Sequence, residues 1–168
     1  MDTPIWALSI AYWFHMLATV FWIGGLAVLS LLILPAARKT LDAQSYAALL
    51  DEFRRRLDSL GWFSIVVLLA SGMLQMSANP NYEGFLSIQG LWGGAILIKH
   101  LLFGVMVALG GYLTWGIMPA LRRAALLRAR GKAAPEVEKL HTRSVTLMQV
   151  NLVLGILVLL LTAVARSV

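Results

Sequence analysis

The chain has 168 residues, of which 60% are hydrophobic and only 13% are charged, whereas an ordinary soluble domain carries about 25% charged residues. It contains no cysteine, which excludes disulfides, iron–sulfur clusters and thiolate metal sites. The net charge of +6 does not indicate a nucleic-acid partner, because no base-reading motif is present and the basic residues gather at the ends of apolar segments. Membrane lipid with anionic headgroups is the partner that this placement of charge predicts.

Four apolar segments are each long enough to cross a bilayer, which takes about 20 residues of helix. In chain order, the expected membrane helices cover residues 6–34, 60–78, 88–118 and 144–165. Pro35 and Pro119 are expected to end the first and the third of them. Residues 40–58 are polar with apolar positions at helical spacing, which predicts an amphipathic segment at the inner interface, and residues 120–142 are expected to form a basic inner loop. The predicted fold class is all-α, an integral membrane four-helix bundle in which residues 1–168 form a single transmembrane domain.

The lysines and arginines predict how the helices are oriented in the membrane. The link between the first and second helices and the link between the third and fourth together hold twelve of them. The link at residues 79–87 and the N-terminal tail hold none, and only Arg166 opposes the trend. Because basic loops stay in the cytoplasm, we expect both termini outside and the two basic segments inside.

The first and third helices contain a repeated pattern. Each has a histidine, a Gly-Gly pair nine or ten residues later, and Pro-Ala-x-Arg at its inner end. His15 precedes Pro35 by 20 residues, and His100 precedes Pro119 by 19. Both helices run from outside to inside, so the two halves are expected to be parallel helix-pair repeats about an axis along the membrane normal.

Three ionisable residues lie deep in the predicted helices, namely His15, Lys99 and His100. Such groups are costly in a bilayer and are functional candidates by default. The repeat places the two histidines at a similar depth in the outer half of the membrane, and two histidines on facing helices of a bundle can ligate one haem iron. The leading hypothesis is a b-type haem protein for electron transfer or for oxidation of a lipid-soluble or tetrapyrrole substrate, with both histidines as metal ligands. Lys99 is the candidate catalytic residue, which would hold a propionate or the substrate.

The helix face around His100 is rich in glycine. Gly93, Gly104 and Gly111 all lie within about 40° of His100 at about 100° per residue, which would leave room for a flat macrocycle. Small residues also let membrane helices approach closely, and the sequence does not decide between these two interpretations. On the first helix, Trp22 shares the face of His15, where it could line a cofactor pocket or simply pack.

Two alternative functions stay open. Met16, Met73 and Met76 also lie toward the outer half, and histidine combined with thioether ligands suits Cu(I), so His15 with these methionines would form a copper-handling site. The chain could instead be a small accessory subunit that holds lipid or pigment in a larger membrane complex. Polar residues of the helices are expected to form interhelical hydrogen bonds; these are Ser64, Ser71, Gln75, Gln149 and Asn151.

Several short segments resemble those of a known group of membrane proteins. They are His15-Met-Leu, residues 21–25 and residues 34–36 in the first helix, Arg55-Arg-Leu before the second, Ser71-Gly near its end, and residues 93–99 leading the third. On these segments the chain resembles the copper-resistance protein D family and the related HemJ-type protoporphyrinogen oxidases.

The resemblance implies a multi-pass protein of the bacterial inner (plasma) membrane. Copper-resistance D proteins are associated with copper import across that membrane. HemJ-type proteins bind haem b and use a histidine of helix 1 and a lysine of helix 3, which match His15 and Lys99. In this chain His100 follows the lysine directly, and residues 110–112 read Gly-Gly-Tyr where the HemJ-type helix carries tyrosine and histidine, so oxidase activity does not follow. The chain has half the membrane content of a full copper-resistance D protein, which implies a homodimer or a subunit of a larger complex.

Overall fold

The computed structural model describes residues 4–82, 84 and 89–167. Its elements in chain order are α1 (Ile5–Ala27), the π-helical turn η1 (Val28–Ile33), α2 (Leu34–Thr40), α3 (Ala43–Ser77), α4 (Gly90–Gly111), the π-helical turn η2 (Tyr112–Ile117), α5 (Met118–Ala129) and α6 (Glu136–Ser167). Four helical spans are long and apolar enough to cross a membrane: Ile5–Thr40, Asp58–Ser77, Gly90–Ala129 and Glu136–Ser167. The predicted all-α fold with four spanning helices is confirmed, and the chain is a multi-pass membrane protein.

The two prolines that the sequence predicts as helix ends lie inside continuous helices. The helix of Pro35 runs on to Thr40, and the helix of Pro119 runs on to Ala129. A proline ring clashes with the carbonyl group one turn earlier. Here η1 and η2 precede the two prolines, and the wider π turn relieves that clash. The predicted helix ends at residues 34 and 118 are therefore wrong, and the basic loop predicted at 120–142 is shorter, because α5 and α6 extend into it.

The two π-helical turns also bear on the predicted repeat. η1 begins at residue 28 and η2 at residue 112, which is the same separation in sequence as that between Pro35 and Pro119. A duplication of one helix pair would produce the same irregularity at the same place in both halves. The repeat stays a prediction, and this correspondence supports it.

α3 joins two segments that the sequence predicts as separate. The amphipathic segment predicted at 40–58 and the membrane helix predicted at 60–78 form one continuous helix. Asp42 caps its first turn, where the carboxylate accepts hydrogen bonds of 2.9 Å from the N–H groups of Gln44 and Ser45. Hydrogen bonds from the backbone and the hydroxyl of Ser45, together with that from Gln44, hold the pKa of Asp42 below its usual range. The cap thus fixes where the long helix begins.

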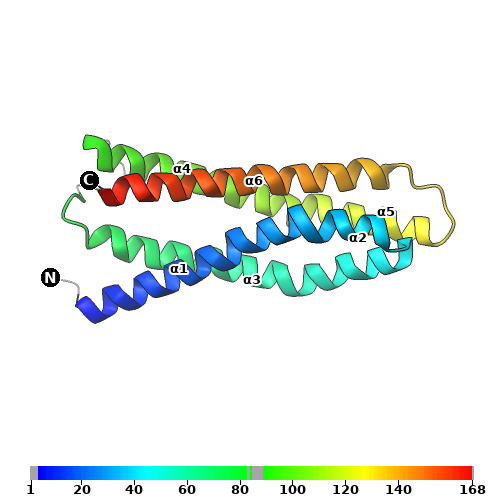
Figure 1. Ribbon diagram of the computed structural model, residues 1–168, viewed down its shortest axis with the longest axis horizontal. Helices are drawn as coiled ribbons and strands as arrows, with labels where there is room; N and C mark the ends of the chain where they lie inside the picture. The colour runs from blue at the N-terminus through cyan, green and yellow to red at the C-terminus, as the bar shows by residue number, and fades with distance from the viewer. Residues whose placement is uncertain (1–3, 83, 85–88, 168) are drawn as a thin grey trace.

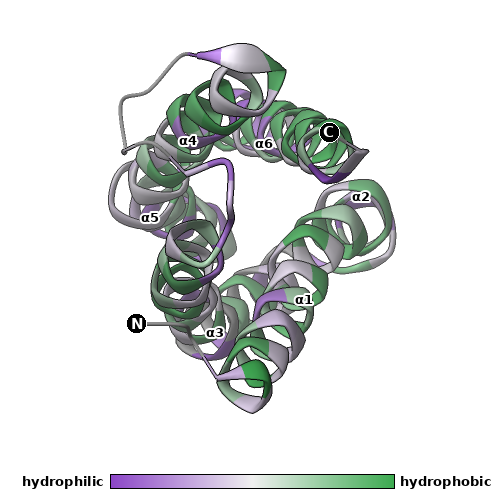
Figure 2. Cartoon of the chain, turned by 90° about the vertical axis from the view of Figure 1, so that its left-hand side faces the viewer, coloured by the Kyte–Doolittle hydropathy of each residue, from purple (hydrophilic) through white to green (hydrophobic). Residues whose placement is uncertain are grey.

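The helices form a ring in which neighbours in the sequence pair. α1 packs along α3, α4 packs along α6, α5 contacts α3, and α1 contacts α6 (Figure 1 and Figure 2). The start of α1, the end of α3, the start of α4 and the end of α6 lie at one end of the bundle (Figure 1). We call this the outer end, following the predicted orientation, and we call the opposite end, which holds the α2–α3 and α5–α6 links, the inner end.

Among the described residues the core forms three clusters, which follow one another from the inner end to the outer end. Their most buried members include Leu34, Leu113 and Leu121 in the inner cluster, Trp22, Ile65 and Met106 in the middle cluster, and Met76, Trp92 and Ala95 in the outer cluster. Many large apolar side chains are also exposed on the bundle, and Figure 2 colours much of each spanning helix as hydrophobic. Such a surface suits helices that face lipid.

A buried polar pair ties α3 to α6 at the inner end. The hydroxyl of Tyr46 lies 2.5 Å from Nδ1 of His141, a residue that is only 5% exposed. Beside them, Arg38 of α2 forms an ion pair with Glu138 of α6. Burial raises the pKa of Tyr46 to about 12, so the hydroxyl stays protonated in its hydrogen bond with the imidazole.

Replacing Tyr46 with phenylalanine is expected to destabilise the protein by about 1–3 kcal/mol, because the buried His141 ring loses its partner. The measurement is thermal unfolding of the detergent-solubilised protein. Tyr82→Phe is the matched control, since Tyr82 is exposed at the outer end and its substitution should leave the unfolding temperature unchanged. Unfolding of Tyr46→Phe at the wild-type temperature would contradict the prediction.

Candidate functional site

His15 of α1 faces α3 in the outer half of the bundle. Its Nδ1 lies 2.9 Å from the Ser71 hydroxyl oxygen, and that hydroxyl donates a hydrogen bond to the carbonyl oxygen of Val67. Because the single hydroxyl proton of Ser71 is used in that bond, the serine oxygen accepts from the imidazole, and Nδ1 carries the ring proton. The lone pair of the neutral ring is then on Nε2, which is free to act as a metal ligand.

Packing against α3 also holds the His15 ring. A Cβ atom at Gly72 would lie 3.3 Å from Cε1 of that ring, so the close approach of the imidazole depends on glycine at this position. One turn later, the side-chain amide of Gln75 donates a hydrogen bond of 3.3 Å to the carbonyl oxygen of Ala11. The ring is therefore positioned by a neighbouring helix through both packing and hydrogen bonding.

His100 of α4 has the same tautomer. Its Nδ1 lies 2.7 Å from the carbonyl oxygen of Ile96, one turn earlier in the same helix. A carbonyl oxygen only accepts hydrogen bonds, so Nδ1 donates and the lone pair is on Nε2. The two candidate ligands thus share one chemical form, but His15 is anchored by α3 and His100 by its own helix. Their joint ligation of one iron stays a prediction.

Two cations lie close to these histidines. Lys99 is half-buried, and its positive charge interacts electrostatically with the imidazoles of His15 and His100. The charge of Arg166 interacts in the same way with His15 and with Lys99. The guanidinium carbon of Arg166 lies 4.3 Å from the centre of the Tyr12 ring. Lys99 forms no hydrogen bond or ion pair with another residue of the described ranges. A cation inside a membrane bundle is costly, so these two charges attract an anionic group and weaken the binding of a further cation.

The glycine-rich face of α4 does not form one open wall. Gly93 is buried, whereas Gly104 is exposed and a Cβ atom there would meet nothing within 4 Å. A Cβ atom at Gly111 would lie 3.0 Å from the indole of Trp115, which stacks on Trp62 with ring centroids 4.8 Å apart. At Gly111 the small residue therefore makes room for indole packing, and the haem-wall role of this face stays a prediction.

Trp22, the predicted pocket residue of α1, is buried in the middle cluster of the core. Its ring meets that of Phe103 edge to face, with centroids 5.4 Å apart. Phe103 lies one turn beyond His100 on α4. The contact links α1 to α4 just inside the level of the two histidines, and the cofactor-pocket role of Trp22 stays a prediction.

The methionines of the predicted copper site differ in their exposure. Met16 and Met73 are 60% and 56% exposed, whereas Met76 is only 7% exposed and packs in the outer cluster beside Trp92. Within the described ranges, no group of three or more histidine, aspartate or glutamate side chains could hold a metal ion. A metal at this site would therefore depend on one or two histidine nitrogens and on thioether sulfur.

The relationship to known proteins follows from one family match. The family model described as Copper resistance protein D matches residues 51–165, which is more than half of the chain. The chain belongs to the copper resistance protein D family. No curated protein and no solved structure matches it. The predicted resemblance is confirmed for this family, and the resemblance to HemJ-type proteins stays a prediction.

The match to the copper resistance protein D family runs from within α3 to near the end of α6. It contains Ser71, Lys99 and His100, whereas α1 with His15 precedes it. Family membership therefore supports copper resistance as the setting of the protein. The assignment of His15 rests on its geometry.

Several predicted interhelical hydrogen bonds are confirmed. Ser71 bonds to His15 and Gln75 bonds to Ala11, and Asn151 donates a bond of 3.2 Å to the carbonyl oxygen of Met106. Ser64 instead bonds to Leu60 in its own helix, so that prediction is wrong.

The sequence did not link Ser71 to His15 or Arg166 to Lys99. The sequence clue to these contacts was the similar depth of the four residues in the membrane, since the outer end of each spanning helix carries one of them. Depth alone does not say which helix faces they occupy.

Proposed function

We propose that the chain binds Cu(I) as a cargo ion in the outer half of the bundle, with Nε2 of His15 as the first ligand. The observation that carries the proposal is the hydrogen bond to Ser71, which keeps the proton on Nδ1 and presents the Nε2 lone pair. Membership of the copper resistance protein D family supports copper as the ion. Imidazole and thioether ligands both suit Cu(I).

Met76 is the methionine best placed to supply the second ligand. It is buried on α3, one turn beyond Gly72, against which the His15 ring packs. Residues four apart share a helix face, so Met76 lies on the same face of α3 as Gly72, where its side chain packs beside Trp92 of α4. Met16 and Met73 face outward and are not part of the proposed pair.

Lys99 and Arg166 weaken this binding, as suits an ion that has to leave again. Two unit charges of like sign about 10 Å apart repel by about 2 kcal/mol at an effective dielectric constant of about 20. Both cations act on His15, so a bare copper ion bound there is repelled by each of them. The proposed site therefore exchanges copper and does not retain it permanently.

Copper loading of the purified protein tests the proposal. The protein in detergent is incubated with Cu(I) under reducing conditions, passed through a desalting column and analysed for metal content and absorption. We expect copper to co-elute with the protein in a colourless sample, because Cu(I) has a filled d shell. Protein that elutes without copper would contradict the proposal.

Haem b is the second candidate, and a different observation favours it. His15 and His100 carry the same Nδ1-protonated tautomer on two helices of the bundle, and the cations Lys99 and Arg166 lie near them. Haem supplies an iron that takes two imidazole nitrogens, and its propionates would match the two cations. The same absorption spectrum decides, since a sharp Soret band in protein from haem-replete cells would favour haem over copper.

The proposed setting is the inner membrane of a bacterium, with both termini outside. The distribution of lysine and arginine supports this orientation, and the family supports a membrane in which copper is handled. Assembly as a homodimer or with another subunit belongs to the same proposal.

A further inference from the structure

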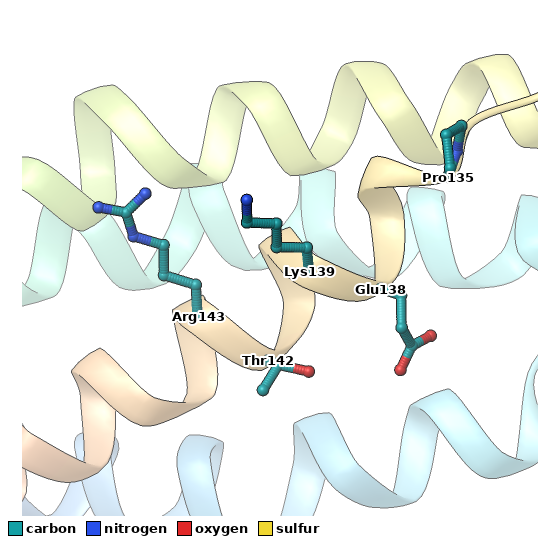
Figure 3. A pocket seen from close by; sticks show the side chains of 5 residues that line it. All are labelled: Pro135, Glu138, Lys139, Thr142 and Arg143. Atoms are coloured by element: carbon teal, nitrogen blue, oxygen red, sulfur yellow. The ribbon is translucent and has the colours of Figure 1, made fainter.

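An open pocket of about 570 Å³ lies at the inner end of the bundle, on the first turns of α6. It is lined by Pro135, Glu138, Lys139, Thr142 and Arg143. Figure 3 shows Lys139 and Arg143 extending to the same side of α6, while Glu138 extends to the opposite side. The pocket is thus bordered by two cations that are four residues apart on one helix face.

The charge of this pocket is not balanced by the described residues. Glu138, its one acidic residue, is engaged by Arg38 of α2. Lys139 forms no hydrogen bond or ion pair with a residue of the described ranges. The guanidinium of Arg143 lies over the Tyr112 ring, 5.4 Å from its centre, a contact that leaves its positive charge in place. Two uncompensated positive charges therefore remain beside an open pocket.

An apolar track continues from the pocket along the same helix face. Residues seven apart on a helix differ in direction by about 20°, which puts Val150 and Leu157 on the face of Arg143. Both are exposed, and both lie in the span Glu136–Ser167 that is apolar enough to cross a membrane. A cationic pocket at the end of a lipid-facing apolar track matches the shape of a phospholipid, which has a charged headgroup above a long acyl chain.

We propose that this pocket binds the headgroup phosphate of one anionic phospholipid, whose acyl chain lies along the α6 face. Arg143 presents the planar donor fork that matches phosphate oxygens, and Lys139 adds a point charge on the same side of the helix. Basic pockets on the cytoplasmic side of membrane helices recognise acidic headgroups in this way. The lipid is anionic, because a zwitterionic headgroup would leave the two cations uncompensated.

Native mass spectrometry of the intact chain tests the proposal. The protein in detergent is titrated with phosphatidylglycerol, and separately with phosphatidylcholine of the same acyl chains. The wild-type protein is expected to bind one phosphatidylglycerol in preference to phosphatidylcholine. The double variant Lys139→Gln/Arg143→Gln is expected to lose affinity for phosphatidylglycerol by about twenty-five-fold, since each cation near an anionic headgroup contributes about fivefold.

The control variant removes two positive charges at the same end of the bundle but outside the pocket. Arg128 and Arg130 are exposed at the end of α5 and do not line the pocket, so Arg128→Gln/Arg130→Gln should bind as the wild type does. The single variants Lys139→Gln and Arg143→Gln should each lose about fivefold, which keeps the test valid if the double variant fails to fold. An equal loss in the control, or equal binding of the two lipids by the wild type, would overturn the proposal.

Discussion

Replacing His15 with alanine should abolish the binding of Cu(I). The imidazole provides the first ligand of the proposed pair, and a single thioether at Met76 does not hold the ion by itself. The loss should exceed the roughly 10- to 100-fold that removal of an outer-shell partner costs. Cu(I) affinity is measured by competition with a chromophoric Cu(I) chelator in detergent solution.

Two further variants show which part of the His15 environment matters. Ser71→Ala removes the acceptor that fixes the tautomer, so Cu(I) affinity should fall by about 10- to 100-fold while some binding is retained. His100→Ala should leave copper binding unchanged, whereas a haem shared by both histidines would be lost in either histidine variant. Wild-type copper affinity in His15→Ala would rule out the proposed ligand.

The membrane fold could be predicted from the sequence because its signal is one of composition and length. Four apolar runs in a chain with only 13% charged residues have no stable place except a bilayer. The runs begin and end close to the spans seen in the structure, apart from the inner ends. There Pro35 and Pro119 predicted stops, and the π turns before them let the helices continue to Thr40 and Ala129.

The pairing of helices was not contained in the apolar pattern. All four spans are apolar on most sides, so no polar stripe identifies the face that packs. The structure pairs α1 with α3 and α4 with α6, and this pairing decides that His15 meets Ser71. The same pairing buries Met76 and leaves Met16 and Met73 exposed. The positions of the methionines along the chain did not reveal this difference in exposure.

The candidate site was predictable as a set of residues, but its chemistry was not. His15, Lys99 and His100 stand out because ionisable groups are rare in membrane helices. The tautomers depend on single hydrogen bonds, from His15 to Ser71 and from His100 to the carbonyl oxygen of Ile96. The approach of Arg166 to Tyr12 likewise depends on the register of α6 against α1, which the sequence does not specify.

Replacing Lys99 with leucine, which removes the charge without adding a ligand for copper, should separate copper from haem by the sign of its effect. The charge of Lys99 acts on both His15 and His100. If a copper cation binds at His15, loss of this charge removes repulsion, and Cu(I) affinity should rise on the order of tenfold. If haem binds, loss of the charge removes a partner for a propionate, and haem retention should fall.

The two outcomes are measured on the same variant by chelator competition and by absorption. Lys132→Leu is the matched control, because Lys132 is exposed at the inner end and its charge is far from the outer half of the bundle. It should change neither quantity. A decrease in Cu(I) affinity in Lys99→Leu would mean that the ammonium group assists copper binding, which contradicts a bare cation at His15. An increase in Lys99→Leu with no change in Lys132→Leu would place the ion nearer to Lys99 than to Lys132, because Coulomb repulsion falls with distance.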